Sequence, residues 1–214
     1  MRCDKTMMRL YAVTDRAWVG RQSLYEQVES ALQGGVTCVQ LREKQLEDGE
    51  FLKEALRLRE LCRRYRVPFI VNDRVELALR CGADGVHVGQ SDMRAENVRK
   101  LIGSEMIVGV SARTVEQAKE AEQAGADYLG VGAVFATATK ADAGPVSRDE
   151  LGRICAAVSI PVVAIGGIGR KNILQLSGSG IDGVALVSAI FSAKDIETEC
   201  RELLALSKRA AGLH

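Results

Sequence analysis

The sequence predicts an α/β protein with a (β/α)₈ fold, the TIM barrel. Short apolar, β-branched runs alternate with longer helical patterns along the chain. The runs are apolar at nearly every position, which is typical of parallel strands covered by helices on their outer face. A chain of 214 residues suits one substantial core and is short for two. We therefore expect a single domain over residues 1–214.

Each apolar run is the expected position of one barrel strand. The eight runs are residues 10–14, 37–41, 68–72, 85–88, 106–110, 128–131, 161–165 and 184–187. Eight strands with their helices fit within a chain of this length, at the compact end of the range for such barrels.

Helices are expected between the strands. Residues 48–65 place apolar side chains at helical spacing on one face. Residues 114–124 form another helical pattern, in which Thr114 can cap the start and Gly125 follows the end. A C-terminal helix is expected over about 194–210.

The main alternative is an open doubly wound sheet, which normally has a glycine-rich phosphate turn after its first strand. Here Asp15 and Arg16 follow the first strand, without a glycine fingerprint, and the glycines gather near the end of the chain. Three similar turns join a helix to the next strand, namely Gly82-Ala83-Asp84, Gly125-Ala126-Asp127 and Gly180-Ile181-Asp182. They predict short structural turns, in which glycine ends each helix, and they favour the barrel.

The charge balance and the cysteines exclude several classes of protein. The formal net charge is +1, with 29 basic and 28 acidic residues, so we expect no nucleic-acid partner. No apolar run is long enough for a membrane span, and residues 1–10 lack the apolar core of a signal peptide. Six dispersed cysteines without a CxxC pair predict neither disulfides nor zinc: Cys3, Cys38, Cys62, Cys81, Cys155 and Cys200. We expect most of them to be small buried residues of a cytoplasmic protein.

Polar or glycine residues follow all eight expected strands, and those after the second to the eighth strand contain the candidate site residues. They are Gln40-Leu41-Arg42-Glu43-Lys44, Asn72-Asp73-Arg74, Gly89-Gln90-Ser91-Asp92, Ser111, Thr137-Ala138-Thr139-Lys140, Gly166-Gly167 and Val187-Ser188. In a barrel these ends meet on one face, where the active sites of such enzymes lie. Helix capping is an alternative role for Asp92 and Ser188.

The charges at these ends predict a metal-bound pyrophosphate site. Asp73 and Asp92 end adjacent strands, and two carboxylates leave room for the waters and phosphate oxygens that Mg²⁺ retains. Arg42, Lys44 and Lys140 can face the same anion, Arg with a bidentate fork and Lys as a point charge. A surface network of salt bridges is the alternative interpretation.

A second anion site is expected after the seventh and eighth strands, which is a frequent phosphate site in barrels. Gly166-Gly167 and Val187-Ser188 lie there, and Gly169 is the expected start of a helix. Two anion sites indicate two phosphorylated substrates.

His87 is the only histidine besides the terminal His214, and it lies within an apolar strand. We expect a packed, hydrogen-bonded barrel residue and not a base. No Ser/His/Asp or Cys/His arrangement is present for nucleophilic catalysis. The predicted site therefore acts electrostatically, by positioning two substrates and stabilising a departing pyrophosphate.

Several motifs together resemble the thiamine phosphate synthase family. They are Tyr11-Ala-Val-Thr-Asp15, Gln40-Leu-Arg-Glu-Lys44, Val71-Asn-Asp-Arg74, Gly85-Val-His-Val-Gly-Gln-Ser-Asp92, Gly109-Val-Ser111, Thr137-Ala-Thr-Lys140, Ala164-Ile-Gly-Gly167 and Val187-Ser188. The resemblance runs in order from about residue 10 to 191.

The resemblance implies a transferase that joins hydroxymethylpyrimidine pyrophosphate to thiazole phosphate and releases pyrophosphate. It implies dissociative chemistry, in which pyrophosphate leaves before the thiazole nitrogen captures a pyrimidine cation. Binding of the pyrimidine pyrophosphate is implied for Gln40, Arg42, Lys44, Asn72, Ser111 and Lys140, with Leu41, Glu43 and Ala138 beside them. Mg²⁺ is implied on Asp73 and Asp92, and the thiazole phosphate on Thr137, Thr139, Gly167, Val187 and Ser188. The catalytic residues implied are Arg42, Lys44, Ser111 and Lys140.

One departure from the family pattern is Ala136, where the family usually has proline. It affects the stiffness of the loop over 136–146, which is the expected lid, and removes no functional group. A thiazole tautomerase-like protein and a non-catalytic thiazole phosphate-binding regulator are the alternatives. A sugar-phosphate isomerase would need a Glu or Cys base, whereas Glu43 is expected to orient its basic neighbours. Nothing in the sequence decides whether the chain forms a homo-oligomer.

Overall fold

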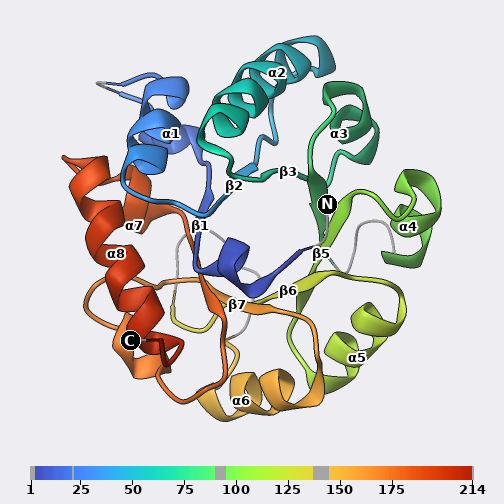
Figure 1. Cartoon of the computed structure of the whole chain (residues 1–214), viewed down its shortest axis with the longest axis vertical. Helices are drawn as coiled ribbons and strands as arrows, with labels where there is room; N and C mark the ends of the chain where they lie inside the picture. The colour runs from blue at the N-terminus through green and yellow to red at the C-terminus, as the bar shows by residue number, and fades with distance from the viewer. Residues whose placement is uncertain (1–2, 21, 90–94, 137–144, 214) are drawn as a thin grey trace.

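A computed structural model describes residues 3–20, 22–89, 95–136 and 145–213. Its centre is a closed barrel of eight parallel strands, each paired with the next in chain order and the last with the first (Figure 1). The predicted (β/α)₈ fold is confirmed. The strands are β1 (Leu10–Val13), β2 (Cys38–Leu41), β3 (Phe69–Asn72), β4 (Gly85–Val88), β5 (Ile107–Ala112), β6 (Tyr128–Gly132), β7 (Val162–Ile165) and β8 (Gly183–Leu186).

Helices surround the barrel as an outer ring (Figure 1). The α-helices are α1 (Leu24–Gln33), α2 (Asp48–Tyr65), α3 (Val75–Cys81), α4 (Ala95–Ile102), α5 (Val115–Gln123), α6 (Arg148–Ala157), α7 (Ser188–Phe191) and α8 (Ile196–Ala210). Three 3₁₀ helices complete the described elements: η1 (Lys5–Met8), η2 (Arg16–Trp18) and η3 (Ile173–Leu176). The helix over 48–65 is confirmed, and Thr114 caps α5 by accepting a hydrogen bond from the Gln117 amide.

The segment between β7 and β8 differs from the prediction, because it contains the short η3 and no full helix. Gly169 was expected at a helix start, and this expectation is wrong. Its amide donates to Asn172 Oδ1 at 2.8 Å, which closes a tight turn before η3. Gly178 and Gly180 have positive φ values that end helical structure on the other side of η3. The long α8 packs against η3 and α1 and covers the barrel there.

The repeated Gly-Ala-Asp and Gly-Ile-Asp turns are structural, as predicted. Their glycines adopt left-handed backbone conformations after the preceding helices. Their aspartates each accept a hydrogen bond from an amide at the start of a neighbouring strand: Asp84 from Phe69 at 2.8 Å, Asp127 from Val108 at 2.8 Å and Asp182 from Val162 at 2.9 Å. These turns therefore link adjacent strands at the amino-terminal end of the barrel.

The core has two parts, one between the strands and the helices and one inside the barrel. The inner part contains large side chains from several strands, among them Tyr11, Ile70, Ile107 and Tyr128. Met8 of η1 belongs to this inner cluster, and η1 covers the amino-terminal mouth of the barrel (Figure 1). The opposite mouth is thus the end at which a substrate can enter.

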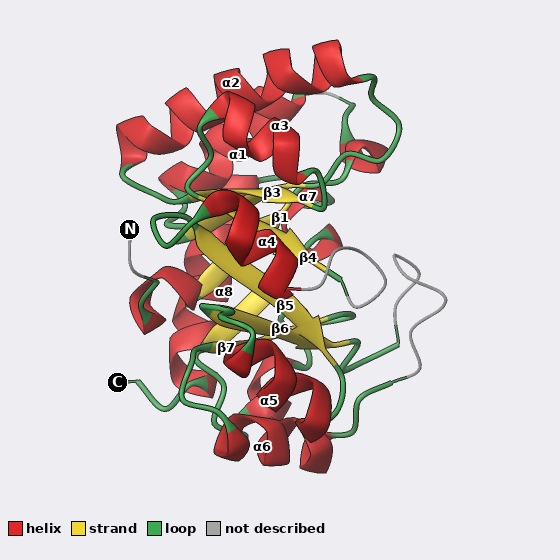
Figure 2. Cartoon of the chain, turned by 90° about the vertical axis from the view of Figure 1, so that its right-hand side faces the viewer, coloured by secondary structure: helices red, strands yellow, loops and turns green. Residues whose placement is uncertain are grey.

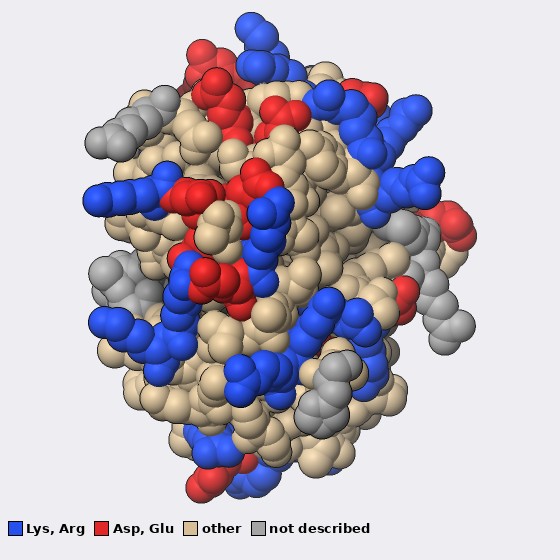
Figure 3. Space-filling model, turned by 60° about the vertical axis from the view of Figure 1, so that its left-hand side comes forward, with Lys and Arg blue, Asp and Glu red and all other residues tan. Residues whose placement is uncertain are grey.

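Figure 2 shows the barrel from the side, with the arrowheads of β5 and β6 at the right-hand end. This end is formed by the carboxyl ends of the parallel strands and by the loops that follow them. On the face formed by α1 and α8, acidic and basic side chains are interspersed (Figure 3). Arg170, for example, donates to Glu199 at 2.8 Å. Of the helices in the described part of the chain, none has the length and hydropathy needed to cross a membrane.

Candidate functional site

The parallel register brings the predicted site residues of the described strands to one rim. Gln40 pairs with Ile70 across β2 and β3, Asn72 pairs with His87, and Ser111 lies one strand further on. Five predicted site residues lie outside the described residues: Asp92, Thr137, Ala138, Thr139 and Lys140. Most of the expected lid over 136–146 also lies outside them.

Arg42 and Lys44 form a basic group immediately after β2. Thr14 orients the start of this segment, because its buried Oγ1 accepts a hydrogen bond from the Arg42 amide at 3.0 Å. Arg42 is half-buried and Lys44 is exposed. Within the described ranges, neither side chain has a hydrogen-bond or ion-pair partner. Two cations at a barrel mouth without partners among the described residues are suited to an anionic ligand.

Glu43 does not orient these two cations, so the expectation for this residue is wrong. Its carboxylate accepts a hydrogen bond from Arg16 Nε at 2.9 Å, and only 4% of its side chain is exposed. Arg16 belongs to η2, after the first strand, and also contacts Glu54 on α2. Glu43 therefore links the loop after β1 to the loop after β2, with its charge paired to Arg16.

Leu41 and Gln40 lie on opposite faces of β2. The Leu41 side chain is fully buried in the core between the strands and the helices. Any contact that it makes with a substrate therefore comes from its main chain. Gln40 faces the inside of the barrel, where its Nε2 donates to the Tyr11 hydroxyl at 2.8 Å.

Asp73 follows β3 in a left-handed conformation, with φ at +60°. This conformation is uncommon outside glycine, and asparagine and aspartate adopt it most readily. The Asp73 amide donates to the His87 carbonyl at 2.9 Å, and Asn72 Nδ2 donates to Asp73 Oδ2 at 2.5 Å. The carboxylate is exposed at the rim. An oriented, exposed carboxylate is a suitable oxygen ligand for a hard cation.

A chain of hydrogen bonds crosses the inside of the barrel and joins five strands. Gln40 bonds to Tyr11, whose hydroxyl lies 2.7 Å from that of Tyr128. The Tyr128 hydroxyl is 3.0 Å from Nδ1 of His87, and Nε2 of His87 is 3.0 Å from Ser111 Oγ. His87 is thus a packed, hydrogen-bonded barrel residue, as predicted. This series of hydrogen bonds connects two predicted substrate-binding residues, Gln40 and Ser111, through side chains that were not predicted to act in substrate binding.

Burial keeps the inner hydroxyls neutral. It raises the pKa of Tyr11 and of Tyr128 well above the ordinary value for a phenol. All six cysteines are free thiols. Burial raises the pKa of four of them, Cys3, Cys62, Cys155 and Cys200, to about 12. A thiol with such a pKa is a poor nucleophile at neutral pH, which agrees with the structural role expected for these residues.

The ends of β7 and β8 form a second part of the rim. Gly166 and Gly167 both have positive φ values, of 98° and 65°. A Cβ atom on Gly167 would lie 2.4 Å from the Ala136 carbonyl oxygen. Val187 precedes α7, and the exposed Ser188 is its first residue. The first amides of a helix have no carbonyl partner within it, so this end of the rim can donate hydrogen bonds to an anion.

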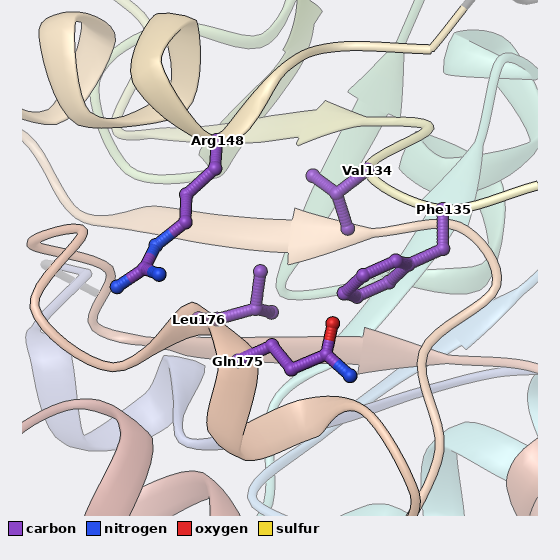
Figure 4. Close-up of a pocket in the computed structure, with 5 residues that line it drawn as sticks. All are labelled: Val134, Phe135, Arg148, Gln175 and Leu176. Carbon is purple, nitrogen blue, oxygen red and sulfur yellow. The ribbon is translucent and has the colours of Figure 1, made fainter.

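A cavity of about 250 Å³ lies near these residues, lined by Val134, Phe135, Arg148, Gln175 and Leu176. Figure 4 shows Phe135 and Val134 facing Gln175 and Leu176, with Arg148 extending away from Phe135. Arg148 donates to the carbonyl of Ser177 at 2.6 Å. None of the lining residues is a predicted site residue, and we assign no ligand to this cavity.

Four residues beside the predicted site were not identified as functional from the sequence: Tyr11, Thr14, Arg16 and Tyr128. Tyr11 and Tyr128 lie in apolar strands that are buried on both faces, so they are indistinguishable from core residues by pattern alone. A clue was available in Gly109, since a glycine inside a strand indicates the close approach of another group. Arg16 gave no such signal, because its partner Glu43 is distant in sequence.

Comparison with known proteins extends over nearly the whole chain. Residues 10–190 match the family model described as thiamine monophosphate synthase. The thiamine-phosphate synthase of Ruminiclostridium cellulolyticum is 52% identical over 195 residues, which are 91% of this chain and 93% of that protein. The thiamine-phosphate synthase of Clostridium acetobutylicum is 46% identical over 201 residues, or 94% of this chain and 95% of that protein. The solved structure of thiamine phosphate pyrophosphorylase from Pyrococcus furiosus has a TM-score of 0.89 and 38% identity, covering 96% of this chain and 98% of that one.

Proposed function

We infer that this chain, which belongs to the thiamine monophosphate synthase family, is a transferase that makes thiamine phosphate. The observation that carries this inference is the match to synthases at 52% and 46% identity over more than nine-tenths of both proteins. The substrates are a hydroxymethylpyrimidine pyrophosphate and a hydroxyethylthiazole phosphate. The pyrimidine methylene carbon loses its bond to pyrophosphate, which leaves with the electron pair, and gains a bond to the thiazole nitrogen.

We assign the pyrophosphate to the basic group after β2. Arg42 offers a planar fork for two phosphate oxygens, and Lys44 adds a point charge. Both lack a protein partner within the described ranges, and Glu43 is paired with Arg16 instead. The positive charge is therefore available to stabilise the leaving pyrophosphate. From the sequence, Lys140 is the third cation of this subsite.

We propose that a divalent cation, Mg²⁺, is held by Asp73 together with Asp92. Asp73 fits this role because its carboxylate is exposed at the rim and is oriented by Asn72. The cation would neutralise charge on the pyrophosphate and make it a better leaving group. Asp92 is included on the sequence alone, as the residue that follows the adjacent strand.

The pyrimidine is proposed to bind above the inner hydrogen-bond chain, between Gln40, Asn72 and Ser111. These residues come from β2, β3 and β5 and share the inner side of the rim. The thiazole phosphate is proposed to bind at Gly167, Val187 and Ser188, with Thr137 and Thr139 as further contacts inferred from the sequence. The two substrates thus meet across the barrel mouth.

A dissociative reaction suits the groups on this rim. Cations that stabilise a departing anion are present, and the described cysteines have pKa values raised by burial. His87 is engaged through both ring nitrogens, and no acid–base or nucleophilic side chain is required when pyrophosphate leaves first. The positions of the two substrates then decide where the pyrimidine cation is captured.

Direct assay of the purified chain tests this proposal. With both substrates and Mg²⁺, we expect thiamine phosphate and an equal amount of pyrophosphate, measured by chromatography and mass spectrometry. Omission of either substrate, or addition of a chelator, should abolish both products. Binding of both substrates without product would contradict the transferase and favour a binding protein.

A further inference from the structure

The hydrogen-bond chain inside the barrel has a defined direction. An amide nitrogen can donate but cannot accept, so Gln40 Nε2 donates to the Tyr11 hydroxyl at 2.8 Å. The Tyr11 hydroxyl accepts this bond and lies 2.7 Å from the Tyr128 hydroxyl, which is the acceptor that we assign to the Tyr11 hydrogen. Each donor in the chain therefore determines the role of the next group.

The same reasoning defines the tautomer of His87. The Tyr128 hydroxyl accepts from Tyr11, so it donates its own hydrogen to Nδ1 of His87 at 3.0 Å. Nδ1 must then be the unprotonated nitrogen, and the ring proton lies on Nε2. Nε2–H donates to Ser111 Oγ at 3.0 Å. Because Ser111 accepts from the imidazole, its hydroxyl hydrogen points away from the ring.

We propose that the hydrogen-bond chain through the buried Tyr11 and Tyr128 and the half-buried His87 positions the two polar side chains at its ends for the pyrimidine pyrophosphate. This inference rests on the proposed function. At one end, Gln40 directs its amide N–H inward, which leaves its carbonyl oxygen as the acceptor for a substrate. At the other end, Ser111 is held as a donor. Tyr11, Tyr128 and His87 are thus positioning residues for this subsite.

The direction of the hydrogen bonds between Gln40 and Ser111 matches the chemistry of the substrate. The amino group of an aminopyrimidine donates hydrogen bonds, and the carbonyl of Gln40 can accept them. Pyrophosphate oxygens and pyrimidine ring nitrogens accept hydrogen bonds, and the hydroxyl of Ser111 can donate to them. If the chain ran in the opposite direction, Gln40 would present N–H and Ser111 would present a lone pair. Both ends would then oppose the substrate.

Burial and packing maintain this arrangement. Tyr11 is 1% exposed and Tyr128 is fully buried, so water does not compete for their hydroxyls. The two phenol rings make an edge contact with centroids 5.8 Å apart. On the other side, a Cβ atom on Gly130 would lie 3.1 Å from Cε1 of His87, so the imidazole packs against the β6 backbone where glycine leaves space for it. A fixed ring is what a positioning role requires.

Imidazole ¹⁵N NMR tests the direction of the chain without reference to activity. The protein contains two histidines, so a His214→Gln background leaves His87 as the only imidazole. We expect a protonated Nε2 and an unprotonated Nδ1. In Tyr128→Phe the donor to Nδ1 is lost, and the two nitrogen shifts should converge as the tautomers mix. A proton on Nδ1 in the parent, or an unchanged spectrum in Tyr128→Phe, would overturn the proposal.

Kinetics test the positioning role. Tyr11→Phe and Tyr128→Phe each remove one buried hydroxyl while keeping the ring. We expect each to lower kcat/KM for the pyrimidine pyrophosphate by roughly three- to tenfold, the worth of one hydrogen bond. KM for the thiazole phosphate should not change. Tyr65→Phe, which alters an exposed tyrosine at the end of α2, is the matched control. Equal losses for both substrates, or no loss, would contradict a positioning role.

Substitution of His87 distinguishes its role as a hydrogen-bond donor to Ser111 from a role in filling space. The amide of His87→Gln can still donate to Ser111, whereas His87→Leu cannot. We expect His87→Gln to retain more of the kcat/KM for the pyrimidine pyrophosphate, and equal activities would overturn the role of His87. If the parent made no thiamine phosphate, the proposed function would fail. The ¹⁵N spectrum would still decide the direction of the chain.

Discussion

A Cβ atom on Gly109 would lie 2.1 Å from Cζ of the Tyr128 ring. The phenol of β6 therefore occupies the space that a side chain on the neighbouring strand β5 would fill. Its hydroxyl is the central group of the chain between Gln40 and Ser111. The absence of one methyl group on β5 thus allows a polar network to form inside an apolar barrel.

Gly109→Ala should destabilise the protein, because the buried Tyr128 ring cannot move without disturbing the inner core. Overpacking of this kind costs about 1–3 kcal/mol and sometimes more. Urea unfolding measures the change. Gly49→Ala is the control, since a Cβ there has no neighbour within 4 Å, and it should leave the stability unchanged or raise it. Equal stability of Gly109→Ala and the parent would show that the ring has room to move.

Gly167→Ala should impair the thiazole phosphate subsite. The backbone at residue 167 is left-handed, and the new Cβ would lie 2.4 Å from the Ala136 carbonyl oxygen. We expect KM for the thiazole phosphate to rise by roughly tenfold, equivalent to about 1.4 kcal/mol of binding energy. Gly178→Ala controls for the backbone alone, since its φ is +80° and its Cβ would have no neighbour within 4 Å. A similar rise in KM in Gly178→Ala would point to general destabilisation.

Asp73→Asn should raise the cation concentration required for half-maximal activity and reduce turnover. Asparagine tolerates the left-handed backbone, so the substitution removes the charge and leaves the turn intact. Loss of a residue that hydrogen-bonds a metal ligand lowers metal affinity or activity by about 10–100-fold, and loss of the ligand itself should lower them at least as much. A Mg²⁺ titration of the initial rate measures it, with the exposed Asp149→Asn as control. The sequence predicts the same result for Asp92→Asn, and normal turnover in either variant would contradict the metal assignment.

Arg42→Ala should mainly weaken substrate binding, whereas Arg16→Ala should mainly lower the stability of the fold. Arg42 has no protein partner within the described ranges, so its loss should raise KM for the pyrimidine pyrophosphate and change stability little. Arg16 contacts the buried Glu43, so its loss should destabilise the fold by about 1–3 kcal/mol. Steady-state kinetics and urea unfolding of both variants provide the comparison. Reduced stability in Arg42→Ala would show that its main role is in packing.

Alkaline pH should destabilise the protein. The loss of stability should begin at a pH well below the pKa of the buried thiols in the folded state. In the folded state burial raises the pKa of Cys62 and Cys200 to about 12, whereas the pKa of a thiol in the unfolded chain is about 8.5. Between these values the unfolded state binds fewer protons than the folded state, so the free energy of unfolding falls as pH rises. Below the unfolded pKa this contribution is present in full.

Urea unfolding in a reducing buffer at pH 7.5 and at pH 10 measures this dependence. Cys200→Ala removes one buried thiol, so its stability should fall less steeply between these two values than that of the parent. An equal slope would mean that the thiols do not cause the alkaline loss.

The local sequence pattern was sufficient to predict the order of the helices and strands and the residues at the rim of the barrel. It was not sufficient to predict which residues pair with the charged groups. The helix over 48–65 follows from apolar spacing, and Asp84 follows a helix end that glycine marks. Glu43 was assigned to its neighbours in sequence, yet it pairs with Arg16 from another loop. Gly169 was taken for a helix start, but the positive φ values of Gly178 and Gly180 leave only a short 3₁₀ helix there. Such pairings depend on distances in space, which a linear pattern does not contain.

The sequence by itself determined that the strands are apolar on both faces, that polar residues follow their ends, and that a barrel brings these ends together. These properties are local, because they depend on the period and composition of each segment. Only the tertiary structure decided which apolar-strand residues face inward. It placed Tyr11, Tyr128 and His87 within hydrogen-bond distance of one another and gave their chain a direction. The physical reason is closure of the barrel, which brings β1, β4 and β6 together across an interior that no adjacent pair of strands defines.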